Sequence, residues 1–483
     1  MGIAYNRVRM RRFTRLGLCL LLAIPVVGWQ GGAKKLYVDG FTTKTGAEKL
    51  RDDMIAELRK LNSVSIVSDE ASADLILDGG GEVWVKGYRS FSPRSELKLP
   101  SNGTPIYGGF LSVELKNKQG VTVWSDLVTP ESPSADISKD LSKRVVKHLA
   151  EMLRRPDPPP VFVDPPVNVS LHGAGATFPY PVYSKWFTNY AADNPGAHIT
   201  YDSIGSEAGV RDLIAGSVDF GASDSPDAIR EIAPASQDQY LFFPSVVGAV
   251  VPIVNLPGVP DSISFTPEAL AGIYLGKITK WNDPILKQAN RGVRLPDLDI
   301  VVVHRSDGSG TSYAWTSYLS KANPEWKAKV GARLSPKWPT GRGASGNEGV
   351  ADVVKEIGGS IGYVEFIYAL QNHLSYGKVR NMNGEFVEAS LESIGIAVNQ
   401  SMDVTDDLTA SLADAPGAGS YPIATFTWLV VPAHMSDDAK RSATIAFLKW
   451  MLGPGQRQAA ALGYLPLSKD VLVKEEAAIS KIH

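Results

Sequence analysis

The sequence passes from an apolar strand into a hydroxyl-rich helix start at Ile300-Val-Val-Val-His-Arg-Ser-Asp-Gly-Ser-Gly-Thr-Ser312. Two further segments place small and hydroxyl residues before a helical pattern: Gly173-Ala-Gly-Ala-Thr-Phe178 and Gly205-Ser-Glu-Ala-Gly209. A helix start leaves backbone N–H groups free, and the helix dipole adds partial positive charge there. Three such starts, in the company of Arg305 and Asp224, predict a site that captures an anion.

Strands and helices alternate around these segments from Val169 onward. This order predicts a largely parallel α/β sheet whose loops hold a ligand at the carboxyl ends of the strands. Val246 to Val254 is a nearly continuous β-branched run, which is typical of a buried strand and is expected to cross from one lobe to another. The other elements that we predict here are helices over 182–190, 210–215 and 313–320, and strands over 199–201, 218–220 and 300–303.

The composition is that of an ordinary globular protein. The chain has 483 residues, is 44% hydrophobic and 21% charged, and carries a formal net charge of −2. A near-neutral chain is not expected to bind nucleic acid in bulk, so an anion site must be built from a few placed donors. The length suggests about three domains.

Residues 1–33 have the pattern of an export signal or an N-terminal anchor. A group of arginines precedes the apolar run from Leu16 to Val27, which is shorter than the roughly 20 residues that span a membrane. The single cysteine, Cys19, lies inside this run. Cleavage would leave a chain without thiols, which excludes disulfides and cysteine metal sites.

Residues 34–155 are predicted to form a small α/β domain with the order β-α-β-β-β-β-α. The closing helix is indicated by apolar residues at helical spacing from Ile137 to Leu153, and Lys116-Asn-Lys-Gln-Gly120 is a candidate hairpin turn. No chemical motif occurs in this domain. Residues 156–168 are rich in proline and are expected to be a semi-rigid linker that separates the domain from the anion-binding segments.

From about residue 169 to 483, the chain resembles the periplasmic phosphate-binding proteins of bacterial ABC-type phosphate importers. The stretches that carry the resemblance are Gly173 to Pro179, Val218 to Asp224, Tyr274 to Asn282, Arg305 to Ser312 and Gly358 to Glu365. The resemblance implies a two-lobed periplasmic binding protein fold of type II with discontinuous lobes, preceded by the small α/β domain. Lobe 1 would comprise residues 169–246 and 421–483, and lobe 2 would comprise residues 247–420.

The resemblance also implies a role for each phosphate-binding residue. Hydroxyl and backbone N–H groups would come from the three helix starts, and Arg305 would supply a full positive charge in a geometry that suits phosphate oxygens. Asp307 would orient the guanidinium. The resemblance implies phosphate contacts from Thr177, Phe178, Ser206, Asp224, Arg305, Ser309, Gly310 and Thr311.

Asp224 is the most informative of these residues, because a carboxylate beside an anion is useful only if the anion carries a proton. It would accept a hydrogen bond from a phosphate O–H, whereas ionised sulfate has no such proton. The chain departs from the family at Glu207, where a small residue is usual. We expect Glu207 to point away from the cleft.

The predicted function is extracytoplasmic capture of inorganic phosphate and its delivery to an ABC-type permease in the inner membrane. The chain would be periplasmic, or membrane-anchored if its first segment is not cleaved. No cofactor, metal or catalytic residue is expected. One alternative is a phosphate-sensing or scaffold protein whose N-terminal domain binds an envelope partner, and another is a phosphatase with a serine or threonine nucleophile, for which no base is evident beside Ser309.

Overall fold

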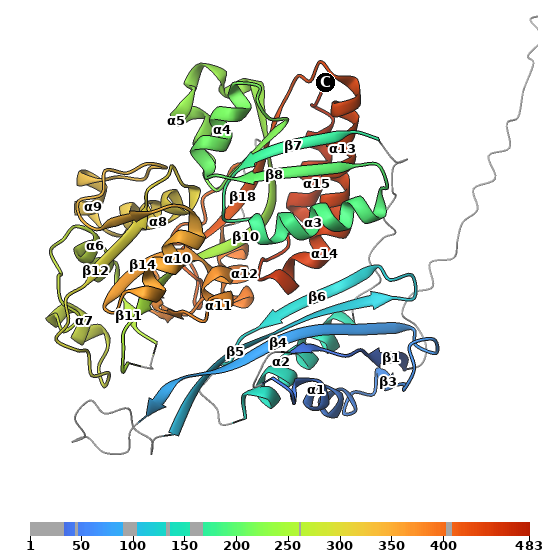
Figure 1. Cartoon of the computed structure of the whole chain (residues 1–483), viewed down its shortest axis with the longest axis horizontal. Coiled ribbons are helices and arrows are strands. Elements are labelled where there is room, and N and C mark those ends of the chain that lie inside the picture. Colours follow the sequence, from blue (N-terminus) through green and yellow to red (C-terminus); the bar gives the residue numbers. More distant parts are fainter. Residues whose placement is uncertain are drawn as a thin grey trace, which may run out of the picture.

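The structure, a computed structural model of the whole chain, describes residues 33–43, 47–89, 104–131, 136–154, 168–259, 262–401 and 408–483. The predicted signal segment and nearly all of the predicted linker lie outside these ranges. Figure 1 shows two α/β lobes side by side, with a third α/β unit lying beneath both of them.

The N-terminal unit has one sheet with helices on one face. Its strands follow the order β3-β1-β4-β5-β6, with β2 beside β4. The elements are β1 (Lys34–Val38), β2 (Thr42–Thr43), α1 (Leu50–Leu58), β3 (Val64–Ile66), β4 (Leu75–Arg89), β5 (Thr104–Asn117), β6 (Thr122–Val128) and α2 (Ile137–Met152). This confirms the predicted α/β class and adds the two-residue β2. The long β4–β5 ladder pairs Leu75 to Arg89 with Thr104 to Asn117.

Residues on the helix-covered face of this sheet alternate with residues on the opposite face. Leu77, Leu111 and Val113 join Leu141 and Val145 of α2 in a core of their own. An apolar residue at every second strand position is what a one-sided core requires.

Lobe 1 contains the first two helix starts and the C-terminal helices. Its elements are β7 (Ser170–Gly175), α3 (Tyr180–Asp193), β8 (His198–Ser203), α4 (Ser206–Ile214), β9 (Phe220–Ser223), α5 (Ala228–Ile232), the 3-10 helix η1 (Pro234–Gln239), β18 (Ala424–Pro432), α13 (Asp438–Trp450), the π-helical turn η2 (Met451–Gly455), α14 (Gln456–Ala459), the 3-10 turn η3 (Ala460–Leu462) and α15 (Lys469–Ile479). β9 begins two residues later than the strand predicted from Val218.

Lobe 2 contains the third helix start. Its elements are β11 (Ser264–Phe265), α6 (Pro267–Tyr274), α7 (Pro284–Ala289), β12 (Val301–Arg305), α8 (Gly310–Ala322), α9 (Pro324–Lys329), β13 (Arg342–Ala344), α10 (Gly346–Glu356), β14 (Ser360–Glu365), α11 (Phe366–Gln371), β15 (Ser375–Tyr376), β16 (Lys378–Arg380), β17 (Phe386–Val387) and α12 (Leu391–Gln400).

One strand, β10 (Tyr240–Asn255), crosses between the lobes. Its first part pairs with β18 from Tyr240 to Ala249, and its second part pairs with β14 from Val250 to Asn255. The predicted crossing strand over Val246 to Val254 is therefore confirmed. The sheet runs β13-β12-β14-β10-β18-β9-β7-β8, with parallel pairs in each lobe and antiparallel pairs at the crossing.

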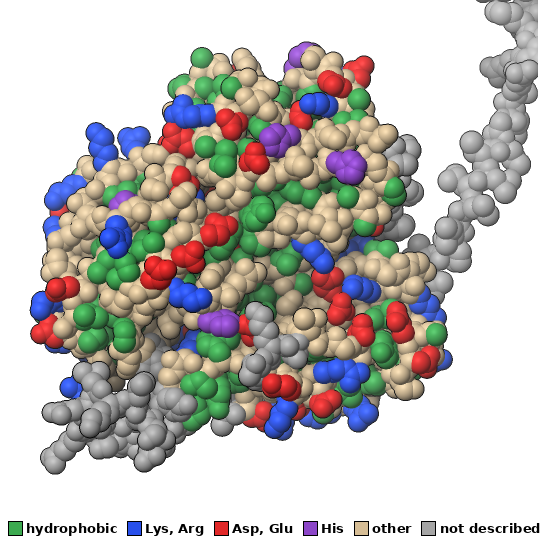
Figure 2. All heavy atoms as spheres, viewed as in Figure 1, with side chains coloured by type: hydrophobic (Ala, Val, Ile, Leu, Met, Phe, Trp, Pro, Cys, Tyr) green, Lys and Arg blue, Asp and Glu red, His purple; other side chains and the backbone are tan. Residues whose placement is uncertain are grey.

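Lysine, arginine, aspartate and glutamate are interspersed on the face of the molecule in Figure 2, and no large region of one sign stands out there. This agrees with a formal net charge of −2. Among the described residues, no helix is both long enough and apolar enough to cross a membrane.

Candidate anion site between the lobes

Arg305 stands at the end of β12 with its guanidinium held by Asp307. Its Nε donates to Asp307 Oδ1 at 2.8 Å, and its Nη2 donates to Oδ2 of the same carboxylate. Its Nη1 donates to the hydroxyl of Thr311 at 3.4 Å. Burial alone would raise the pKa of Asp307, but the bonds to Arg305 outweigh burial and keep the pKa below its usual value. The pair therefore stays ionised inside the protein.

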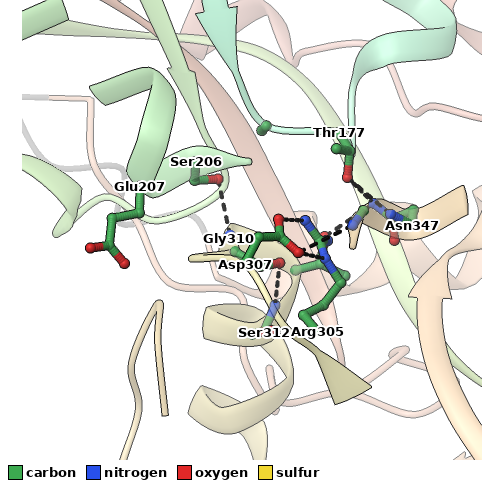
Figure 3. A network of polar contacts seen from close by, with 12 residues as sticks. Thr177, Ser206, Glu207, Arg305, Asp307, Gly310, Ser312 and Asn347 are labelled. Carbon is green, nitrogen blue, oxygen red and sulfur yellow. Dashed lines mark hydrogen bonds and ion pairs between the residues drawn. The ribbon is translucent and has the colours of Figure 1, made fainter. Parts of the chain in front are cut away.

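Two helix starts face each other across the lobes. Ser206 is the first residue of α4, after Gly205 with a φ of 97°, and its Oγ accepts a hydrogen bond from Gly310 N at 2.9 Å. Gly310 opens α8, and a Cβ at this position would lie 2.6 Å from atoms of Asp224. Only glycine permits this close approach of the backbone. Figure 3 shows Ser206 and Gly310 side by side with Asp307 and Arg305.

Asp224 follows β9 and is 1% exposed. One oxygen, Oδ1, accepts a hydrogen bond from the Thr427 hydroxyl at 2.6 Å, while Oδ2 has no hydrogen-bond partner in the described part of the chain. Burial raises the pKa of Asp224 to about 7, against the smaller opposing effects of Thr427 and the Arg305 charge. A buried acceptor without a partner is costly and is uncommon unless a ligand uses it.

Thr177 and Thr311 are joined by a residue that the sequence reasoning missed, Asn347. Asn347 Nδ2 donates to Thr177 Oγ1 at 2.8 Å and lies 3.3 Å from Thr311 Oγ1. Its Oδ1 accepts from Glu365 N at 3.0 Å, which fixes the amide orientation. Asn347 lies in the first turn of α10, after Ser345 and Gly346. This is a fourth helix start with small and hydroxyl residues, and that signal could have identified it.

Two predicted residues have mainly structural contacts. Ser309 caps α8, since its Oγ accepts from Ser312 N at 3.1 Å. Phe178 adjoins Thr177, and its carbonyl accepts from the Tyr464 hydroxyl at 2.7 Å. The structure thus links Thr177, Ser206, Arg305, Gly310 and Thr311 directly or through Asn347, and it places Asp224 against Gly310.

Glu207 points away from this cluster, as expected (Figure 3). Its Oε1 accepts from Arg211 Nη2 at 2.7 Å, and its Oε2 accepts from the Ser335 hydroxyl at 2.5 Å. Partial burial acts to raise the pKa of Glu207, but these two partners lower it on balance. Because Glu207 belongs to lobe 1 and Ser335 to lobe 2, this contact joins the lobes.

Other hydrogen bonds also join the lobes. The Tyr313 hydroxyl donates to Asp227 at 2.6 Å, and the Tyr368 hydroxyl donates to the carbonyl of Thr177 at 2.7 Å. Together with the Ser206–Gly310 bond, they hold the lobes in contact around the candidate site. Within the described ranges, no three or more histidine, cysteine, aspartate or glutamate side chains are grouped so that they could hold a metal ion.

A two-lobed α/β fold joined by a crossing strand, with a candidate anion site between the lobes, is typical of a class of binding proteins, and the comparison with known families agrees. A family model described as a PBP superfamily domain matches residues 160–454, which is more than half of the chain. The chain belongs to this superfamily.

Close relatives narrow the family. The phosphate-binding protein PstS of Xylella fastidiosa (strain Temecula1) is 45% identical over 312 residues, which cover 64% of this chain and 85% of the relative. The phosphate-binding protein PstS of Pasteurella multocida is 43% identical over 310 residues, which cover 64% of this chain and 89% of the relative. The chain is therefore a member of the PstS family, with an additional N-terminal region outside the match.

The fold agrees with a solved structure as well. A high affinity periplasmic phosphate-binding protein (PfluDING) bound with phosphate superposes with a TM-score of 0.51 at 22% identity, over 64% of this chain and 93% of that chain. This confirms the predicted two-lobed fold for the matching part.

Proposed function

We propose that this chain captures inorganic phosphate between its two lobes and delivers it to an ABC-type phosphate permease in the inner membrane. The observation that carries the proposal is the presence of a buried Arg305 and of a buried Asp224 whose Oδ2 has no hydrogen-bond partner among the described residues. The proposed ligand is an anion that also carries a proton, and phosphate near neutral pH meets both requirements.

In the proposed complex, Arg305 attracts the anion while Asp307 fixes the plane of its guanidinium. Backbone N–H groups of Phe178 and Gly310, and hydroxyls of Thr177, Ser206, Ser309 and Thr311, donate to phosphate oxygens. The Ser206–Gly310 and Thr177–Asn347 bonds would give way to bonds with the ligand. Charge-assisted hydrogen bonds contribute about 1.5–3 kcal/mol each, so such a network can reach micromolar affinity or better, about −8 kcal/mol.

Asp224 selects the ligand in this proposal. When ionised, it accepts a hydrogen bond from a phosphate O–H through Oδ2. Sulfate would place an acceptor against an acceptor in a site that excludes water, a mismatch worth about 10³-fold or more in affinity.

A binding role fits Ser309 better than a nucleophilic role, because its Oγ is engaged as a helix cap. A sensing or scaffold role is the alternative function, and the N-terminal domain that lies outside the family match motivates it. Export to the periplasm, or anchoring through residues 1–33, belongs to the same proposal.

Isothermal titration of the full chain with phosphate and with sulfate tests the function. We expect a binding isotherm with phosphate and none with sulfate at pH 8. Absence of heat with phosphate, or equal affinity for sulfate, would contradict the proposal. Turnover of a chromogenic phosphate ester that disappears in the S309A variant would favour the phosphatase alternative.

A further inference from the structure

The N-terminal sheet has a second face, and the two lobes cover it. On β4, Glu82 and Trp84 flank Val83, which packs against the domain's own core, and Lys86 lies beside Gly108 together with Trp84. On β5 and β6, Phe110 and Leu127 likewise face away from α1 and α2 and join the hydrophobic core of the lobes. Figure 1 shows this sheet lying along the lobes on the side away from α4, α5 and α9.

Lobe 1 contacts this face through η3. The Ser112 hydroxyl donates to the carbonyl of Ala461 at 2.8 Å, and Ala461 N donates to Ser125 Oγ at 3.2 Å. Ser125 is 6% exposed and Leu127 is 5% exposed. These buried polar and apolar contacts fix β5 and β6 firmly on lobe 1.

Lobe 2 contacts the same face through the segment after α11. The rings of Trp84 and His373 stack with their centroids 4.3 Å apart, and His373 Nε2 bonds to a carboxylate oxygen of Glu82. Lys86 lies over the ring of Tyr376, with Nζ 5.5 Å from the centroid. His373 has a φ of 56°, a left-handed conformation that is uncommon for residues other than glycine.

A single sheet therefore holds both lobes while they are in contact around the candidate site. β4 and β5 pair from Leu75 to Arg89, so the two sets of contacts belong to one continuous ladder. If lobe 2 rotates away from lobe 1 about β10, the sheet cannot follow both lobes. The lobe 1 contacts of Ser125 and Leu127 are buried, whereas the His373 side chain is 42% exposed, so we expect the contacts of Trp84 and Glu82 with His373 to break first.

We propose that the N-terminal domain stabilises the closed arrangement of the lobes through the contacts of Glu82 and Trp84 with His373, and so slows phosphate release. This inference rests on the proposed phosphate-binding function. A contact made only in the closed state adds its free energy to ligand affinity, by linkage. Stacked rings and a partly exposed hydrogen bond of this kind correspond to about a three- to tenfold change in affinity.

The test uses the full chain and its W84A and H373N variants. Asparagine tolerates the left-handed backbone of residue 373 and removes the ring. The matched control is W124A, because Trp124 lies on β6 and packs against the domain's own core. Phosphate affinity is measured by titration, the dissociation rate by stopped flow, and the separation of the lobes by fluorescence energy transfer between dyes on α5 and α9.

We expect W84A and H373N each to release phosphate about three to ten times faster, the double variant to show no further loss, and W124A to keep the wild-type rate. Unchanged or slower release in W84A would overturn the inference. If the wild-type chain bound no phosphate, the proposed function would fail, and the dye measurement would still show whether W84A opens the lobes.

Discussion

The candidate site and the covered face of the N-terminal sheet both contain buried polar groups, but the sequence pattern indicates the two regions to different degrees. In the candidate site, Arg305 and Gly310 lie within a few residues of each other, in a segment of glycine and hydroxyl residues that opens a helix. On the sheet, Trp84 and Glu82 are specified only by alternation along a strand. The residues of the candidate site can therefore be identified one by one from the sequence. The covered face of the sheet can be recognised only when the lobes that pack against it are seen.

The largest effect should come from the cleft charge. R305M removes the only full positive charge in the proposed phosphate network and leaves Asp307 unpaired in a half-buried position. We expect phosphate affinity to fall by about 10²- to 10³-fold, which is 2.7–4.1 kcal/mol, because a buried charge pair is broken. Isothermal titration measures the loss. R305K keeps the charge without the two-pronged geometry, so its phosphate affinity should lie between those of the wild type and R305M. Wild-type affinity in R305M would exclude Arg305 from the site.

Asp224 should control selectivity more than affinity. In D224N, the amide can donate to an anion without a proton, so the variant should bind sulfate within about tenfold of phosphate. Competition of sulfate against phosphate at pH 8 measures the ratio. A variant that still rejects sulfate would show that discrimination arises elsewhere in the cleft.

The same carboxyl predicts a pH dependence. Burial raises the pKa of Asp224 to about 7, so the group is protonated in the folded protein below that pH and becomes a hydrogen-bond donor. Sulfate should therefore bind the wild-type chain progressively better as the pH falls below about 7. D224N should show no such trend, because its amide does not titrate.

On the sheet side, L127A should act on stability and leave selectivity unchanged. Leu127 is 5% exposed and joins the core of the lobes, so its truncation should cost about 2–4 kcal/mol of unfolding free energy. L141A, in the domain's own core, is the comparison. Chemical denaturation followed by circular dichroism would show the domain and the lobes unfolding together in the wild type. Two separate unfolding transitions, with the L127A substitution shifting the midpoint of only one, would mean that the shared core does not couple the N-terminal domain to the lobes.

The contrast also explains what the sequence could predict. The residues of the candidate site could be predicted from the sequence, because a glycine such as Gly310 and a helix cap such as Ser309 lie within a few residues of each other. Asn347 lies at a similar helix start, but only its bond to Thr177, which lies 170 residues away, shows that its side chain belongs to the site. The covered second face of the sheet was missed for a similar reason. Ser112 and Ser125 fit an exposed strand face equally well, and only their contacts with Ala461 distinguish the two cases.

We expect the smallest changes in phosphate affinity from variants at Glu207, which lies next to Ser206 of the candidate site and also contacts the opposite lobe. Its carboxylate accepts the Ser335 hydroxyl across the lobes, which favours closure, and its charge opposes an anion bound at the start of α4. Two variants separate these effects. S335A removes the contact between the lobes and keeps the charge, so phosphate affinity should fall about two- to fivefold. E207Q keeps an acceptor for Ser335 and removes the charge, so affinity should rise by about twofold at low salt, and the gain should fade as salt screens the charge. Titrations at two ionic strengths measure both. A weaker E207Q at low salt would mean that the ionised carboxylate contributes more to closure of the lobes than it costs by repelling the ligand.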